Sequence, residues 1–167
     1  MKKLIITLLV FICLFPELLY SQGTSPTDKC IPCEKLTELK LPDVKITSAE
    51  AVSAGSSHCK VLGVIGREIN FEILLPDEWN GIFIMGGGGG FVGTVQNAAR
   101  SGVNQGFATS GTDTGHDGSK SPGAEWALNN MERQVNFGHL AVHRTAEVSK
   151  TLIQSYYGSW PKYSYFI

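Results

Sequence analysis

The sequence predicts an α/β fold in which crossover helices connect the strands of one sheet. The first observation is a short apolar segment at residues 81–85, which runs directly into the five glycines Gly86–Gly90. The second is a long helical pattern at residues 130–157, and the third is a strand-like segment after it, at residues 163–167. The order strand, glycine loop, helix, strand, long helix, strand is typical of α/β sheets.

The N-terminal residues have the layout of a secretory signal peptide. Lys2 and Lys3 precede the mostly apolar run Leu4–Phe15, and residues 16–21 end in small and polar side chains. The uncharged run is about a dozen residues long, whereas a membrane-spanning helix needs about 20. We therefore expect a signal peptide at residues 1–21, a secreted or periplasmic protein, and no membrane association after cleavage.

Composition and charge argue against a nucleic-acid partner. The chain has 14 Lys and Arg and 15 Asp and Glu side chains, a formal net charge of −1, and no basic stripe that could neutralise phosphates. A small-molecule substrate is therefore favoured. Residues 22–43, rich in Pro, Thr, Ser and Lys, predict an irregular leader, and residues 44–167 are long enough for one domain.

The first half of this domain predicts strands. Segments rich in β-branched and apolar residues, separated by short turns, are typical of an antiparallel meander, and here they are residues 44–52, 59–65 and 68–75. The segment at residues 81–85 has no polar alternation, which predicts a strand that is covered on both faces.

The second half alternates helices and strands. Residues 94–105 predict a short helix, residues 107–112 a strand that ends at Asp113, and residues 163–167 a buried strand. Between the last two, three- and four-residue steps predict one amphipathic helix whose stripe is Met131, Val135, Gly138, Val142, Thr145, Val148, Leu152 and Tyr156. Gly158 and Pro161 end this helix.

Three cysteines follow the predicted signal peptide: Cys30, Cys33 and Cys59. Thiols pair in an oxidising compartment, and an odd number leaves one of them free or bonded to another chain. Cys30 and Cys33 have the C-x-x-C spacing of a redox motif, but no strand precedes them. A zinc site would need a second such pair or spaced histidines. A structural disulfide is therefore favoured.

The glycine run indicates one of two loop chemistries. In the first, backbone N–H groups stabilise the oxyanion that forms when an ester is hydrolysed, and glycines let the backbone turn sharply beside the substrate. In the α/β-hydrolase pattern this loop follows one strand and the nucleophile turn comes two strands later. Residues 81–85 and 163–167 have that relation.

The second loop chemistry is dinucleotide binding. Gly88, Gly90 and Gly93 match G-x-G-x-x-G, and Asp113 lies about 20 residues further on, where a ribose-binding acid is expected. An NAD-dependent oxidoreductase is nevertheless disfavoured, because three strands precede the loop and a secreted protein meets little NAD. A P-loop is excluded, because no Lys-Ser or Lys-Thr follows the glycines.

Several short motifs together resemble the tannase and feruloyl esterase family. In chain order they are Cys33–Leu36, His58–Gly63, Phe71–Pro76, Trp79–Gly81, Gly88–Phe91, Thr112–His116 and Tyr156–Gly158. In that family a strand like residues 163–167 leads into G-C-S-x-G-G, whose serine is the nucleophile. The resemblance therefore implies that the chain ends just before this motif.

The resemblance implies the N-terminal part of an α/β-hydrolase that cleaves esters of phenolic or related aromatic acids, such as gallate, ferulate or feruloylated polysaccharide. Its Ser-His-Asp triad, and a lid that holds the family's calcium, lie beyond Ile167, so no cofactor is expected in these residues and the chain alone should be inactive. Two family features fall on this chain: an oxyanion-hole amide at Gly90 and a disulfide between Cys33 and Cys59.

Other polar residues are interpreted as structural. Asp113, His116 and Asp117 follow a strand after which an α/β-hydrolase keeps no triad residue, so we expect them to shape the loop. His139 and His143 share a helix face but lack a third metal ligand, and Ser110 and Ser164 lack the G-x-S-x-G context of a nucleophile. A secreted, non-catalytic binding module is the alternative to an esterase.

Overall fold

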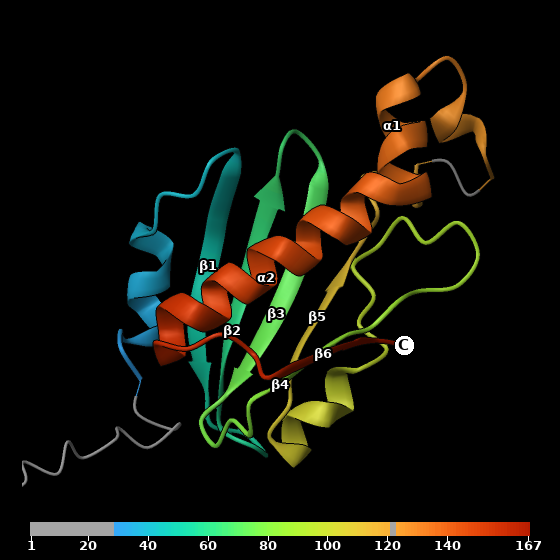
Figure 1. Ribbon diagram of the computed structural model, residues 1–167. Helices are drawn as coiled ribbons and strands as arrows, with labels where there is room; N and C mark the ends of the chain where they lie inside the picture. Colours follow the sequence, from blue (N-terminus) through green and yellow to red (C-terminus); the bar gives the residue numbers. More distant parts are fainter. Residues whose placement is uncertain (1–28, 121–122) are drawn as a thin grey trace, which may run out of the picture.

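The computed structural model describes residues 29–120 and 123–167, so the predicted signal peptide at residues 1–21 lies outside the described residues. Six strands form one mixed sheet in the order β1-β2-β3-β5-β4-β6, and a long helix crosses one face of it (Figure 1). The strands are β1 (Val44–Val52), β2 (His58–Ile65), β3 (Ile69–Pro76), β4 (Ile82–Met85), β5 (Ala108–Thr112) and β6 (Tyr163–Phe166).

The first three strands form the predicted antiparallel meander. Val44 of β1 lies opposite Ile65 of β2, and Cys59 of β2 lies opposite Leu75 of β3. Every second residue of β2 is buried, so that one face of this strand packs on the core. Along β3 nearly every residue is buried, because β3 lies inside the sheet between β2 and β5.

The last three strands form the parallel part of the sheet. β4 lies between β5 and β6 and is parallel to both, while β5 pairs with β3 in the antiparallel direction. All five residues of β5 are buried, and Phe83 and Met85 of β4 point into the core. The carboxyl ends of β4, β5 and β6 therefore lie at the same end of the sheet.

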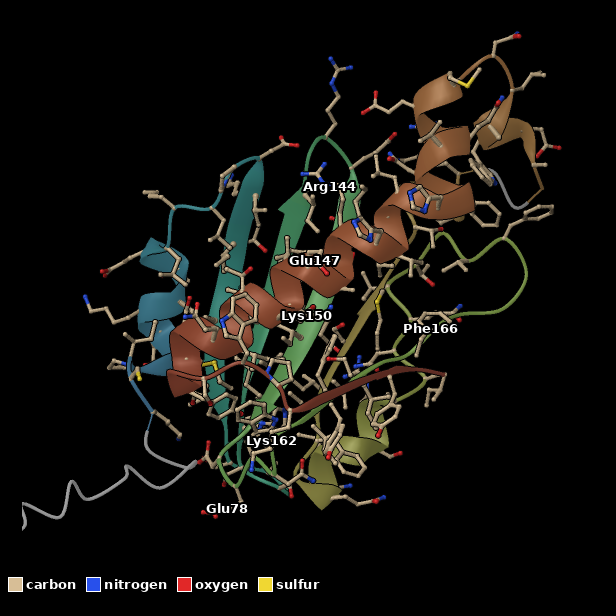
Figure 2. All side chains as sticks on the ribbon, viewed as in Figure 1. Glu78, Arg144, Glu147, Lys150, Lys162 and Phe166 are labelled. Atoms are coloured by element: carbon tan, nitrogen blue, oxygen red, sulfur yellow. A yellow bond between two sulfur atoms is a disulfide. The ribbon has the colours of Figure 1, made fainter. Side chains whose placement is uncertain are left out.

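The predicted helix at residues 130–157 consists of α1 (Met131–Val135), a π-helical turn (Asn136–Leu140) and α2 (Ala141–Tyr157). Asn130 caps its N-terminus by accepting from the Arg133 amide, and Gly158 ends it at a φ of 75°. The polar side chains Arg144, Glu147 and Lys150 lie along the outer side of α2 (Figure 2).

The predicted apolar stripe is confirmed only in the second half of the helix. Thr145, Leu152 and Tyr156 are buried against the sheet, whereas Met131 and Val135 are 70% and 44% exposed. One reason is the π-helical turn, which adds a residue to one turn and rotates the buried face. The other is position, because α1 lies past the ends of the strands (Figure 1).

Two shorter segments also differ from the sequence interpretation. The predicted helix at residues 94–105 is reduced to the 3-10 helix η2 (Arg100–Gln105), whose Arg100 pairs with the buried Glu72 of β3 at 2.7 Å. The leader contains a further 3-10 helix, η1 (Cys33–Glu38), and its Leu36 is fully buried. A third, η3 (Glu125–Ala127), precedes α1.

The core lies between the sheet and α2. Its largest fully buried side chains include Tyr156, Phe71, Phe83, Leu36 and Ile73. At the C-terminal end of α2, Tyr157 stacks on Trp79 with ring centroids 4.3 Å apart and donates to the carbonyl of Pro76 at 2.6 Å. Across the part of the chain that is described, no helix is long and apolar enough to cross a membrane.

The prediction that residues 163–167 form a buried strand is wrong as to burial. The strand exists as β6, but it is the edge of the sheet, and Tyr163, Tyr165, Phe166 and Ile167 are between 55% and 61% exposed. Figure 2 shows Phe166 on this edge. Apolar composition predicted the strand correctly, but burial depends on what covers it.

We expect a polypeptide of residues 22–167, produced alone, to aggregate or to bind hydrophobic dyes strongly. β6 offers unpaired backbone groups and exposed aromatic rings, which together are a template for pairing with another chain. Introducing a charge by Tyr165→Lys should reduce dye fluorescence and light scattering.

The matched control for this experiment is Leu128→Lys. Leu128 is 72% exposed and lies between η3 and α1, so this change removes an exposed apolar side chain and adds the same charge away from β6. A soluble monomer with a cooperative melt in the unsubstituted polypeptide would contradict the prediction.

Candidate functional site

The glycine loop, residues 86–93, leaves the carboxyl end of β4 and lines a cavity of about 590 Å³. Ligands of α/β sheets bind outside the carboxyl ends of the strands, where this cavity lies. Backbone of the loop forms one part of the lining. Apolar side chains from the long helix and from the end of β6 form another part: Phe137, Val142, Phe166 and Ile167.

The first two amides of the glycine loop anchor it to the neighbouring strands. Gly86 donates to the carbonyl of Ser110 and Gly87 donates to the carbonyl of Ile167, both at 2.8 Å. A Cβ at Gly86 would lie 2.4 Å from the backbone nitrogens of Ala98 and Ala99, so a larger residue does not fit there. The start of the loop is therefore fixed between β5 and β6.

The next three amides, of Gly88, Gly89 and Gly90, have no hydrogen-bond partner among the described residues. Gly90 is exposed at the cavity and has a φ of 61°, a conformation that glycine adopts without steric cost. Free N–H groups beside a cavity can stabilise an oxygen on which negative charge develops. This arrangement is suited to an oxyanion hole.

Asp113, the acid that the dinucleotide interpretation requires, is used for structure. Its carboxylate accepts from the backbone and side chain of Asn70, at 3.0 and 2.5 Å, and from the amide of Gly115 at 2.9 Å. Burial raises the pKa of Asp113, although these bonds favour the charged form. Because Asp113 does not line the cavity of the glycine loop, the geometry disfavours NAD binding.

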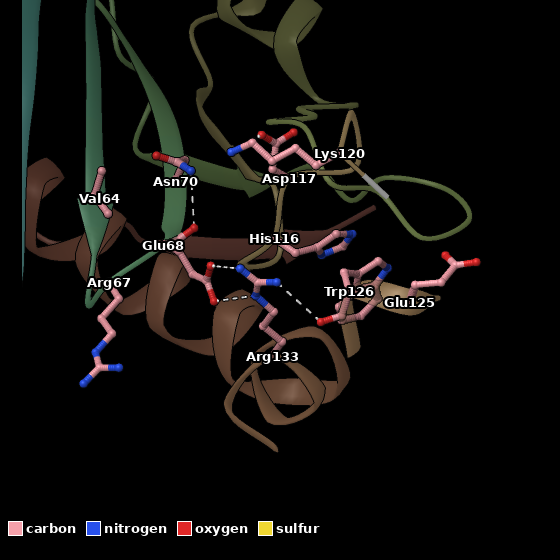
Figure 3. Close-up of a pocket in the computed structure, with 10 residues that line it drawn as sticks. All are labelled: Val64, Arg67, Glu68, Asn70, His116, Asp117, Lys120, Glu125, Trp126 and Arg133. Atoms are coloured by element: carbon pink, nitrogen blue, oxygen red, sulfur yellow. Dashed lines mark hydrogen bonds and ion pairs between the residues drawn. The ribbon is translucent and has the colours of Figure 1, made fainter. Parts of the chain in front are cut away.

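His116 and Asp117 lie at a second cavity, of about 420 Å³, which Figure 3 shows. The His116 side chain is buried, and neither of its ring nitrogens has a hydrogen-bond partner among the described residues. Asp117 instead accepts from Ser119 and pairs with Lys120, which lowers the pKa of Asp117 to about 2. The two residues do not form a catalytic dyad.

The other polar candidates are also placed by the structure. His139 and His143 are exposed on the helix with ring centroids 5.7 Å apart, and the described residues contain no group of three or more side chains that could hold a metal ion. Ser110 is fully buried in β5, so a substrate does not reach it. Ser164 lies on β6.

The cysteines pair as the family resemblance implies. A disulfide joins Cys33 of η1 to Cys59 of β2, with the two Cα atoms 5.6 Å apart. Cys30 is free and exposed, and its amide donates to the carbonyl of Tyr156. The C-x-x-C spacing is therefore not a redox pair, and the disulfide ties the leader to the meander.

A feature that the sequence interpretation missed is a group of aromatic side chains behind the glycine loop. Phe91, His116, Trp126 and Phe137 pack on one another, with ring centroids between 3.8 and 6.3 Å apart. We call them the aromatic cluster. They come from four separate segments and follow no common period, so no local pattern indicates that they meet.

The chain is similar to a known protein family over most of its length. The model for "Tannase and feruloyl esterase" matches residues 54–167. The curated feruloyl esterase B of Aspergillus niger is 39% identical over 97 residues, which cover 58% of this chain and 18% of that protein. An uncharacterized esterase of Xanthomonas campestris pv. campestris is 31% identical over 153 residues, covering 80% of this chain and 26% of that protein.

Two further proteins are similar to this chain. The mono(2-hydroxyethyl) terephthalate hydrolase of Piscinibacter sakaiensis is 29% identical over 70% of this chain and 23% of its own length. The crystal structure of feruloyl esterase B from Aspergillus oryzae superposes with a TM-score of 0.72 at 25% identity, covering 81% of this chain and 31% of that one. The predicted α/β-hydrolase fold is confirmed, and the chain spans less than a third of these relatives.

Proposed function

Because this chain belongs to the tannase and feruloyl esterase family, we propose that it is the N-terminal part of a secreted carboxylic ester hydrolase. The observation that carries the proposal is the glycine loop, whose outer amides are free beside a cavity at the carboxyl ends of parallel strands. In this proposal the amide of Gly90 donates to the oxyanion of the tetrahedral intermediate.

The proposed reaction uses a Ser-His-Asp triad from outside residues 1–167. The serine oxygen attacks the ester carbonyl while the histidine takes its proton, and the carbonyl oxygen becomes the oxyanion that the glycine loop stabilises. The intermediate expels the alcohol, which receives the proton, and water then releases the acid from the acyl-enzyme. A nucleophile turn after β6 would lie beside the loop, because Gly87 is bonded to Ile167.

We propose esters of phenolic or related aromatic acids as the substrates, including feruloylated polysaccharide. Two relatives are named feruloyl esterase B and one is named mono(2-hydroxyethyl) terephthalate hydrolase. The feruloyl and terephthalate groups in these names are both aromatic acyl groups. The apolar side of the cavity, formed by Phe137, Val142 and Phe166, is suited to an aromatic ring.

The experiment is an ester-hydrolysis assay of the complete protein that contains these residues. Methyl ferulate and methyl gallate should be cleaved with release of the free acid, and a serine-directed phosphonate should abolish the activity. Tight binding of these esters without any acid release would instead favour a non-catalytic binding module.

A further inference from the structure

The aromatic cluster includes Phe91, the residue that follows the proposed oxyanion donor Gly90. His116 stacks on Trp126 with ring centroids 3.8 Å apart and planes inclined by 12°, and it meets the edge of Phe137 at 5.9 Å. The ring of Phe91, the residue after Gly90, packs against Trp126 and Phe137 with centroid distances of 6.3 and 6.1 Å. The cluster therefore holds the glycine loop on the C-terminal side of Gly90.

His116 also packs directly against the glycine loop. A Cβ at Gly93 would lie 2.9 Å from Nε2 of His116 and 2.4 Å from the amide nitrogen of Gly118, so the His116 ring occupies the space that a side chain would need. Backbone hydrogen bonds join the same segments, from Gly93 to the carbonyl of Asp113 at 3.3 Å and from Gly118 to the carbonyl of Gly93 at 2.9 Å.

Backbone strain is concentrated where these two segments meet. Val92 in the glycine loop has a φ of 51°, and Thr114 in the loop after β5 has a φ of 63°. Both are β-branched, and such residues are rare outliers in the left-handed region. They keep this conformation only where the surrounding structure determines it, and such positions cluster at functional sites.

We propose that His116 is a positioning residue for ester hydrolysis: its ring, held between Trp126 and Gly93, fixes the segment Phe91–Gly93 and thereby orients the amide of Gly90. The inference rests on the proposed function of Gly90 as an oxyanion donor. His116 itself does not touch substrate, because it is 2% exposed and does not line the cavity of the glycine loop.

The buried position of the ring disfavours its protonated form. Burial lowers the pKa of His116, and the positive charge of Arg133 acts in the same direction, while Asp113, Glu68 and the carbonyl of Phe91 favour the charged form. The remaining charged groups that line the cavity beside His116 are Arg67, Asp117, Lys120 and Glu125.

The sign of the pH effect follows from this pKa. The folded pKa lies below the unfolded value of about 6.5, so the folded state disfavours the proton. The contribution of His116 to stability is therefore fully present above about pH 6.5 and is lost as the pH falls through the folded pKa.

The test compares three variants in the complete protein with methyl ferulate as substrate. His116→Ala removes the ring, His116→Phe keeps an aromatic ring on Trp126 that cannot be protonated, and His58→Ala is the control. His58 lies at the start of β2, where Nδ1 contacts only the carbonyl of Ser56. Circular dichroism and thermal melts establish that each variant is folded.

We expect His116→Ala to lower kcat roughly 30-fold with KM changed less than about 3-fold, because a displaced oxyanion donor acts on the transition state. His116→Phe should stay within about 3-fold of the wild-type kcat, and its melting temperature should lose the part of the acid decline below about pH 6.5 that titration of His116 causes. Rescue by phenylalanine distinguishes positioning from proton transfer, which phenylalanine cannot perform.

Two results overturn the inference. Wild-type kcat in a folded His116→Ala variant shows that the ring does not position the loop, provided that Gly90→Pro loses activity in the same assay. A folded His116→Phe variant as slow as His116→Ala shows that an aromatic ring at this position does not by itself hold the loop. If Gly90→Pro is also fully active, the proposed function fails and the inference fails with it.

Discussion

Replacing Gly90 with proline in the complete protein should lower kcat by about 100-fold or more, with a smaller effect on the melting temperature. Proline has no N–H group and fixes φ at about −65°, whereas Gly90 has a φ of 61°, so the change removes the proposed oxyanion donor and also shifts the loop backbone. Losing one such donor costs about 3 kcal/mol of transition-state stabilisation. The measurement is kcat and KM for methyl ferulate, together with a thermal melt.

Two alanine variants measure the effect of a side chain at positive φ when the backbone N–H group is kept. Gly90 and Gly55 both have positive φ, 61° and 76°, and a Cβ at either position would meet no atom within 4 Å. Gly90→Ala and Gly55→Ala therefore introduce the same strain, but Gly55 lies in the turn between β1 and β2. We expect only Gly90→Ala to lower kcat, and less than Gly90→Pro does. An unchanged kcat in Gly90→Pro would show that this amide is not in the oxyanion hole.

Of the substitutions considered, removing the disulfide should lower the free energy of unfolding the most. The bond between Cys33 and Cys59 closes a loop with a sequence separation of 26 residues. In the chain-entropy model a loop of this size contributes about 3.5 kcal/mol to the free energy of unfolding. Cys33→Ser combined with Cys59→Ser should lower the unfolding free energy by about this amount in urea titrations.

The control for the disulfide is Cys30→Ser, because Cys30 is free and exposed and its loss should leave the unfolding free energy unchanged. Peptide mapping of the protein under non-reducing conditions should recover the Cys33 and Cys59 peptides joined. Recovery of Cys30 bonded to Cys33 would contradict the assignment.

Most of the strands could be predicted because the residues that favour a strand and end it lie within the strand or directly beside it. β-branched residues, turn glycines and Pro76 mark the meander, and the predicted bounds of β1 agree with the structure. Burial was predicted less well where it depends on distant contacts. A regular helical period cannot indicate the π-helical turn at Asn136–Leu140, and apolar composition cannot indicate that β6 is a sheet edge.

In the candidate site, too, local features could be predicted from the sequence, whereas contacts between distant segments could not. The glycine loop could be singled out because a glycine run after an apolar strand is a local signal, and the family resemblance then pointed to Gly90. The aromatic cluster, in contrast, forms only when loops after β4 and β5 meet the segment before α2. Nothing local indicates that Val92 and Thr114 adopt positive φ, since β-branched residues disfavour it. His116 was interpreted as shaping its loop, and the stack on Trp126 gives that interpretation a geometry.

We expect the glycine loop to form the oxyanion hole of an ester hydrolase. The most direct measurement is a crystal structure of the complete protein with a phosphonate bound covalently to its nucleophile, because the phosphonyl oxygen stands in for the oxyanion. We expect this oxygen to lie about 2.7–3.1 Å from the amide nitrogen of Gly90. A phosphonyl oxygen held by other groups, with the Gly90 amide turned away, would contradict it.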